Sequence, residues 1–117
     1  MGTALYGIPN CDTVKRARAW LAERGVAAEF HDFKRAGLDA ARLERWTQAL
    51  GWEALLNRRG TTWRGLPEAE RTAVVDATSA QAAMLRHPSL IKRPVVEWPD
   101  GAITVGFDPD EWARRTA

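Results

Sequence analysis

The chain has 117 residues, of which 45% are hydrophobic and 27% are charged, and its formal net charge is only +2. These values are typical of a soluble globular protein, and we expect one domain over residues 1–117. They exclude a disordered chain and a basic arm that binds nucleic acid, because the arginines are interspersed with acidic residues. No apolar run approaches the ~20 residues of a membrane span.

The chain contains one cysteine. A single cysteine excludes an intrachain disulfide framework and suits a reducing compartment. The first residues lead directly into a strand pattern without the features of a signal peptide, so we expect a cytoplasmic protein.

The first expected element is a short buried strand over residues 4–6, followed by two residues that break regular structure, Gly7 and Pro9. A helical pattern begins after them and ends near Gly25. Its apolar stripe consists of Val14, Ala17 and Leu21. The single cysteine, Cys11, is therefore expected at the N-terminus of this helix.

Cys11 is interpreted as a nucleophile. Unpaired backbone N–H groups and the positive end of the helix dipole stabilise an anion there, so its pKa should lie below the reference value of about 8.5. Lys15 and Arg16, in the first helical turn, should act in the same direction. The alternative is a small buried hydrophobic residue, a common role of free cysteines. The loop and cap residues around Cys11 favour the reactive interpretation.

The residues at fixed distances from Cys11 in the sequence limit the reactions that it can perform. A phosphatase loop, Cys-x5-Arg, needs an arginine where the chain has Ala17, and a Cys-x-x-Cys motif needs a cysteine where it has Val14. One cysteine and two distant histidines supply too few ligands for a metal site. Cys11 is left as a monothiol whose partner sulfur comes from outside the chain, most simply from glutathione or a protein thiol.

A second strand is expected over residues 27–33, and the strand–helix–strand order predicts a parallel pair. His31 in this strand is interpreted as structural rather than as a catalytic base. Residues 34–37 are expected to form a loop.

Residues from about 37 to 88 are expected to form a helical insertion. Asp39 should cap its first helix, which should end at Gly51. Trp46 and Trp52 are interpreted as core anchors because of their helical spacing.

Two further helices are expected later in the insertion. Pro67 should occupy the first position of one, with Val74 and Val75 on its apolar side. Ser79 should cap the next, and His87-Pro88 should end it.

Between these helices, residues 57–64 are expected to form a loop that combines arginines with Gly60 and two hydroxyl groups. Composition supports two interpretations of this loop equally. It is either a solvated polar connection or a grip for carboxylates and oxyanions, which guanidinium groups bind in bidentate fashion.

The C-terminal part is expected to return to the sheet. A third strand is entered through Pro94, a turn follows at residues 99–101, and residues 103–105 form the return strand. Asp108 should cap a final helix anchored by Trp112. The prediction is an α/β fold with a four-stranded mixed sheet and a helical insertion between its second and third strands.

This order of elements, with a cysteine after the first strand, resembles the thioredoxin fold. Three stretches extend the resemblance to the arsenate reductase (ArsC)/Spx family, and within it to the YffB-like branch. They are Tyr6-Gly7-Ile8-Pro9-Asn10-Cys11-Asp12-Thr13-Val14-Lys15, Ala54-Leu55-Leu56-Asn57-Arg58-Arg59-Gly60-Thr61-Thr62-Trp63-Arg64, and His87-Pro88-Ser89-Leu90-Ile91-Lys92-Arg93-Pro94. The resemblance covers nearly the whole chain.

The resemblance implies a thioredoxin-like fold with a helical insertion, a cis peptide bond at Arg93-Pro94, and a cysteine that forms a mixed disulfide or an arsenate thioester with the help of glutathione. The family's arsenate reductases surround the oxyanion with three arginines, and Arg93 matches one of them. Asn57 stands at the second position, so Arg58 or Arg59 would have to replace it.

Two other positions depart from the family pattern. The third arginine would fall near Gly106-Phe107, where this chain has none. Val14 replaces the serine or cysteine that usually follows three residues after the nucleophile, which also removes the Cys-x-x-Cys switch of Spx-type regulators.

We therefore predict a glutathione-dependent thiol reductase in which Cys11 is the nucleophile and forms a mixed disulfide with glutathione. The residues expected to bind the substrate or the anionic groups of glutathione are Asn10, Thr13, Val14, Lys15, Arg58, Arg59, Arg93 and Pro94. Glutathione is the expected co-substrate, with glutaredoxin as a candidate partner, and the substrate is a small oxyanion or a disulfide. We expect no metal, no bound organic cofactor, no nucleic acid and no membrane partner.

Two alternatives stay open from the sequence. One is an arsenate reductase coupled through glutathione and glutaredoxin. The other is an Spx-like interaction protein without enzymatic activity, in which Cys11 is incidental.

Overall fold

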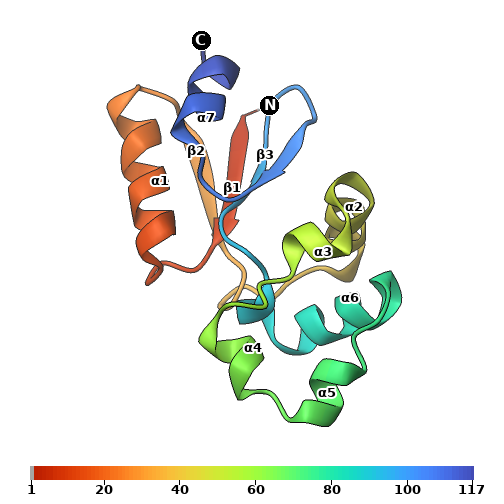
Figure 1. Cartoon of the computed structure of the whole chain (residues 1–117). Helices are drawn as coiled ribbons and strands as arrows, with labels where there is room; N and C mark the ends of the chain where they lie inside the picture. The colour runs from red at the N-terminus through yellow and green to blue at the C-terminus, as the bar shows by residue number, and fades with distance from the viewer. Residues whose placement is uncertain (1) are drawn as a thin grey trace. The chain divides into compact units, whose positions relative to one another are not determined.

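The computed structural model describes residues 2–117, and Met1 lies outside the described part. The chain forms two compact units (Figure 1). The first runs to Ala36 and resumes over Arg93–Ala117, and the second is Gly37–Lys92. The predicted helical insertion, about residues 37–88, falls within the second unit, and the interpretation of the whole chain as one domain stays a prediction.

The first unit is built on a four-stranded sheet with the strand order β2-β1-β3-β4. The strands are β1 (Thr3–Gly7), β2 (Ala28–Asp32), β3 (Val95–Glu97) and β4 (Ile103–Val105). The pair β1 and β2 is parallel, whereas β1 with β3 and β3 with β4 are antiparallel. The predicted α/β fold with a mixed four-stranded sheet is confirmed.

Two helices pack against this sheet, α1 (Asp12–Glu23) and α7 (Pro109–Arg115) (Figure 1). Leu5 of β1 and Val96 of β3 are register partners, so their side chains point to the same face. Both belong to a buried core whose other members are Val14, Ala17, Leu21, Trp98 and Trp112. The apolar stripe predicted for the first helix is the side that α1 buries.

Trp112 anchors α7, as predicted, and is fully buried. Its ring meets Trp98 at 5.3 Å and Phe107 at 4.8 Å between centroids, in edge-to-face arrangements that aromatic rings prefer. The Asp108 carboxylate accepts hydrogen bonds from the N–H groups of Asp110 and Glu111, so its predicted role as a cap is confirmed.

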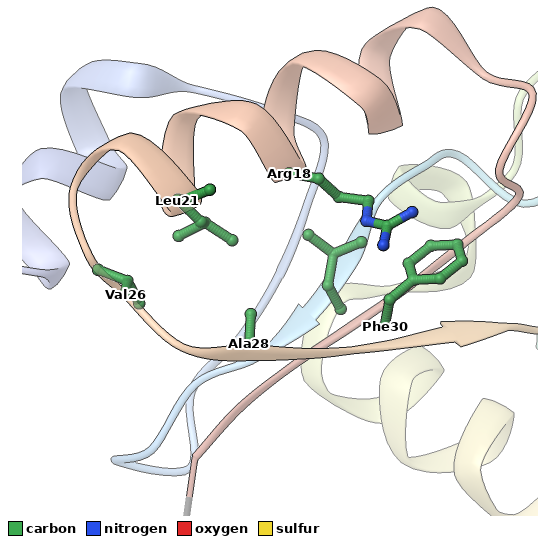
Figure 2. Close-up of a pocket in the computed structure, with 7 residues that line it drawn as sticks. Arg18, Leu21, Val26, Ala28 and Phe30 are labelled. Carbon is green, nitrogen blue, oxygen red and sulfur yellow. The ribbon is translucent and has the colours of Figure 1, made fainter.

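A hollow of about 190 Å³ lies between α1 and β2 (Figure 2). The guanidinium of Arg18 lies 4.2 Å from the ring centre of Phe30, so both side chains cover the apolar wall formed by Leu21, Val26 and Ala28. Cys11 is not among the residues that line this hollow.

The second unit is helical. Its elements are α2 (Ala40–Leu50), α3 (Trp52–Leu55), α4 (Thr61–Gly65), α5 (Glu68–Thr72), α6 (Ala77–Arg86) and the 3-10 helix η1 (Pro88–Leu90). The Asp39 carboxylate accepts a hydrogen bond from the N–H of Ala41, and Gly51 follows α2 with a φ of 85°, so both predicted ends of this helix are confirmed. Trp46 is fully buried as predicted, but Trp52 is only half-buried.

Three other predictions for this unit are wrong. Residues 57–64 are not a continuous loop, because α4 begins at Thr61. Val75 does not supply the apolar side of a helix, because α5 ends at Thr72 and the Val75 side chain is 71% exposed. Pro67 lies just before α5 rather than at its first position.

The cap of α6 also differs from the prediction. Asp76 is the N-cap residue, and its carboxylate accepts a hydrogen bond from the N–H of Ser79. The Ser79 hydroxyl accepts in turn from the N–H of Asp76, which completes a capping box. Ser79 is therefore the third residue of the helix rather than its cap.

Gly7 at the end of β1 lies close to Val14 of α1. A Cβ atom on Gly7 would lie 2.8 Å from Cγ2 of Val14, whose side chain is fully buried. We expect Gly7→Ala to lower the free energy of unfolding by about 1–3 kcal/mol, the usual cost of overpacking. Urea denaturation measures this change.

The matched control is the same substitution in a Val14→Ala background. Removing the Val14 methyl groups also removes the atoms that the new Cβ would meet, so the cost of Gly7→Ala should be smaller there. An equal cost in both backgrounds would show that the contact is not the cause.

Candidate active site

The loop after β1 ends at Cys11, which lies at the start of α1. The N–H of Cys11 donates to the carbonyl of Ile8 at 3.2 Å, which closes a tight turn. Cys11 is the N-cap residue of α1, and its carbonyl accepts the first helical hydrogen bond, from the N–H of Lys15 at 2.9 Å. The predicted position of Cys11 at the helix N-terminus is confirmed.

Cys11 is half-buried. It packs against the core formed by residues such as Leu5 and Val14, but it is not enclosed by them. The side chain is therefore fixed on one side and accessible to solvent on the other, as a thiol that reacts with external molecules requires.

The pKa of the Cys11 thiol is lowered from its ordinary value. Partial burial is the largest single influence and raises the pKa, because it disfavours the charged form. The N–H of Val14, the hydrogen bond and positive charge of Arg93, and the N–H of Thr13 all lower the pKa and together outweigh burial. The thiolate is thus stabilised by the helix start and by a guanidinium.

Arg93 reaches this position because of the sheet topology. The antiparallel pairing of β1 with β3 sets Tyr6 opposite Val95, so the two residues that precede β3, Arg93 and Pro94, lie near the end of β1. The Arg93-Pro94 peptide bond is cis, as the resemblance implied. The carbonyl of Pro94 accepts a hydrogen bond from the N–H of Gly106 at 2.9 Å, which ties this junction to the segment after β4.

Lys15 was expected to lower the pKa of Cys11, but it is not among the groups that do so within residues 2–117. Its side chain is exposed, and water screens such a charge strongly. The cation beside the sulfur comes from Arg93, far along the chain, rather than from the first turn of α1.

The sequence interpretation missed three residues that gather next to the Cys11 loop. Asp32, Lys34 and Arg35 line a groove of about 360 Å³ together with Ile8, Pro9 and Asn10. The sequence could have indicated this groove, because parallel strands end at the same edge of a sheet. Asp32 ends β2 and Lys34 and Arg35 follow it, just as Asn10 follows β1, the parallel partner of β2. Asn10 was predicted as a binding residue and lies in this groove.

Arg58 and Arg59 belong to the second unit. They line a groove of about 360 Å³ there with Asn57 and Lys92. The guanidinium of Arg58 lies 5.2 Å from the ring centre of Trp52, while the Asn57 side chain accepts a hydrogen bond from the N–H of Arg59. The predicted action of these arginines on a ligand of Cys11 stays a prediction.

The remaining sequence interpretations concern His31, metals and membranes. The His31 ring stacks on Tyr6 with 4.6 Å between centroids, a packing contact in line with its structural interpretation. Within residues 2–117 no cluster of three or more histidine, cysteine or acidic side chains is arranged to hold a metal ion. No helix in this part of the chain combines the length and the apolar character needed to span a membrane.

Comparison with known proteins gives consistent results. The model of the ArsC family matches residues 6–115. The solved structure of a YFFB protein is 50% identical, covers 98% of this chain and 99% of its own, and superposes with a TM-score of 0.92. The solution structure of an arsenate reductase (ArsC) related protein from Brucella melitensis is 51% identical over 97% of this chain and 93% of its own, with a TM-score of 0.77.

Two curated proteins are also similar to this chain in sequence. An uncharacterized protein from Haemophilus influenzae is 41% identical over 97% of both chains. The global transcriptional regulator Spx from Streptococcus agalactiae is 27% identical over 92% of this chain and 77% of its own. The resemblance found in the sequence is confirmed.

The lowered pKa predicts how the reactivity of Cys11 depends on pH. Only the thiolate reacts with iodoacetamide, so the alkylation rate should rise with pH and level off above the pKa of Cys11. We expect this midpoint to lie below that of an ordinary cysteine thiol, because the pKa of Cys11 is lowered. A stopped-flow or mass-spectrometric pH profile measures it.

Two variants test which cation lowers the pKa of Cys11. Arg93→Gln removes the hydrogen bond and the charge that stabilise the thiolate, so the midpoint should rise. Lys15→Gln removes an exposed charge and should shift it less. A larger shift with Lys15→Gln than with Arg93→Gln would contradict this assignment.

Proposed function

Because the chain belongs to the ArsC family, we propose that it is an oxidoreductase, and specifically a glutathione-dependent thiol reductase with Cys11 as its nucleophile. The observation that carries this proposal is the environment of the Cys11 sulfur. It is half-buried, stands at a helix start, and is stabilised as a thiolate by Arg93 and by the N–H groups of Thr13 and Val14. Such a sulfur is suited to attack a disulfide.

The first step is thiol–disulfide exchange. The Cys11 thiolate attacks one sulfur of a disulfide that carries a glutathionyl group, the Cys11–glutathione bond forms, and the other sulfur leaves with the electron pair of the broken bond. Solvent protonates the leaving thiolate. The N–H groups of Thr13 and Val14 and the guanidinium of Arg93 hold the negative charge near the reacting sulfurs during exchange.

The second step needs a thiol from outside, because the chain has no second cysteine. The thiolate of a second glutathione attacks the Cys11–glutathione disulfide, oxidised glutathione is released, and the Cys11 thiolate is regenerated. Over both steps the disulfide that carries the glutathionyl group and one glutathione thiol are converted into a free substrate thiol and oxidised glutathione, so atoms and electrons balance. Glutaredoxin can replace the second glutathione: its thiolate attacks the glutathionyl sulfur, glutathionylated glutaredoxin forms, and the Cys11 thiolate leaves.

The other predicted residues have binding roles in this proposal. Arg58 and Arg59 bind anionic groups of the substrate, and Asn10 and Lys15 contact it beside the nucleophile. The backbone before Pro94 pairs with the bound thiol peptide. These roles are supported by residue chemistry and by the family resemblance.

Exposure to oxidised glutathione tests the proposal. We expect the protein to gain the mass of one glutathionyl group, visible by intact-mass spectrometry, and Cys11→Ser to gain none. Arg93→Gln should form the same adduct about tenfold more slowly at neutral pH, because less thiolate is present. Failure of the unmodified protein to form the adduct would overturn the proposed function.

Arsenate reduction is the second candidate function. The observation that favours it is the position of Arg93, because a guanidinium beside a thiolate also suits an oxyanion. Two observations weigh against it. Asn57 serves as a turn residue that binds the N–H of Arg59, and Phe107 packs on Trp112 where a third arginine would be expected.

We expect arsenate turnover no higher than that of Cys11→Ser. The assay follows arsenate-dependent oxidation of NADPH coupled through glutathione and glutaredoxin. Turnover clearly above the Cys11→Ser control would establish the second candidate.

A further inference from the structure

Apart from Asn10, the groove beside the Cys11 loop has no role in the exchange chemistry described above. Its lining comes from two turns, Ile8, Pro9 and Asn10 after β1 and Asp32, Lys34 and Arg35 at the end of β2, and its volume is about 360 Å³. Asn10 directly precedes Cys11, so the groove begins next to the nucleophile.

The second turn is held in place by backbone hydrogen bonds. Gly7 and Asp32 are register partners at the ends of β1 and β2, and the N–H of Phe33 donates to the carbonyl of Gly7 at 3.2 Å. The Asp32 Oδ1 atom accepts from the N–H groups of Lys34 and Arg35, at 3.1 and 3.2 Å. The two cationic residues are thus fixed to the end of β1, where the Cys11 loop starts.

The charges of this groove are of both signs. Lys34 and Arg35 are exposed, and among residues 2–117 neither side chain makes an ion pair or a side-chain hydrogen bond. The Asp32 carboxylate uses Oδ1 for the turn but keeps capacity for further donors, since a carboxylate accepts about four hydrogen bonds. The groove therefore offers two cations and one anion.

We propose that this groove binds the α-amino-acid group at the γ-glutamyl end of glutathione, with Lys34 and Arg35 contacting its carboxylate and Asp32 its ammonium. The inference rests on the proposed function, because glutathione enters through it. Three extended residues span roughly 10 Å, so the γ-glutamyl end reaches past the sulfur that reacts with Cys11.

The charge pattern selects this end of glutathione over the other. The glycyl end presents a carboxylate without an ammonium, so Asp32 would face it as a like charge. The γ-glutamyl end presents both charges side by side, and the groove has a partner for each.

The test uses S-methylglutathione, which keeps every charge of glutathione but has no thiol and cannot exchange. Its affinity is measured by NMR titration or calorimetry at low ionic strength. We expect Lys34→Gln/Arg35→Gln to weaken binding about tenfold, in line with two partly exposed charge pairs. The control Arg45→Gln/Arg114→Gln makes the same change in net charge at exposed sites that do not line the groove, and it should bind like the unmodified protein.

Asp32→Asn tests which end of glutathione occupies the groove. Asparagine keeps the Oδ1 acceptor that holds the turn, and only the charge is lost. We expect binding to weaken about threefold, as the ammonium loses its partner. Tighter binding would show that a bare carboxylate occupies the groove and would overturn the proposal.

The outcomes separate the groove from the proposed function. If S-methylglutathione binds with the predicted sensitivities but oxidised glutathione forms no adduct, the groove proposal holds and the thiol reductase proposal fails. If the adduct forms but Lys34→Gln/Arg35→Gln binds S-methylglutathione like the unmodified protein, the groove proposal fails alone. Absence of any measurable binding to the unmodified protein also overturns it.

Discussion

The negative charge on the Cys11 sulfur is the constraint on which the candidate site depends. Two kinds of donor support it: backbone N–H groups at the start of α1, and the guanidinium of Arg93. Partial burial disfavours the charged thiolate and opposes these donors. Because Cys11 is only half-buried, its sulfur is held in position and is still accessible to reactants.

The pairing of the strands brings the groups around Cys11 together. The parallel pair β1 and β2 brings the turn that carries Lys34 and Arg35 next to the Cys11 loop. The antiparallel pair β1 and β3 brings Arg93 to the same end of β1. One strand thus organises both a reactive sulfur and the charged groups around it, although these residues are far apart in the sequence.

Local signals allowed much of the fold to be predicted. The stripe of α1, the caps Asp39 and Asp108 and the turn at Gly51 depend on residues a few positions apart, so the sequence shows them directly. The cap of α6 was assigned to Ser79 instead of Asp76 because both are good cap residues, and a capping box uses both.

The failures have two physical causes. Helix α4 has only five residues, too few to show a periodic pattern. The cation beside Cys11 was assigned to Lys15 because that residue is close in sequence, whereas strand pairing brings Arg93 close in space. Lys34 and Arg35 were interpreted only as loop residues for the same reason, since their neighbours come from another strand.

The antiparallel pairing of β1 with β3 also couples chemistry to folding. Ribosomes synthesise Cys11 long before Arg93, and the whole of Gly37–Lys92 lies between them in the sequence. Until β3 docks, the sulfur lacks its guanidinium and has only the N–H groups at the start of α1 to stabilise its negative charge. Full stabilisation of the thiolate therefore requires the completed sheet.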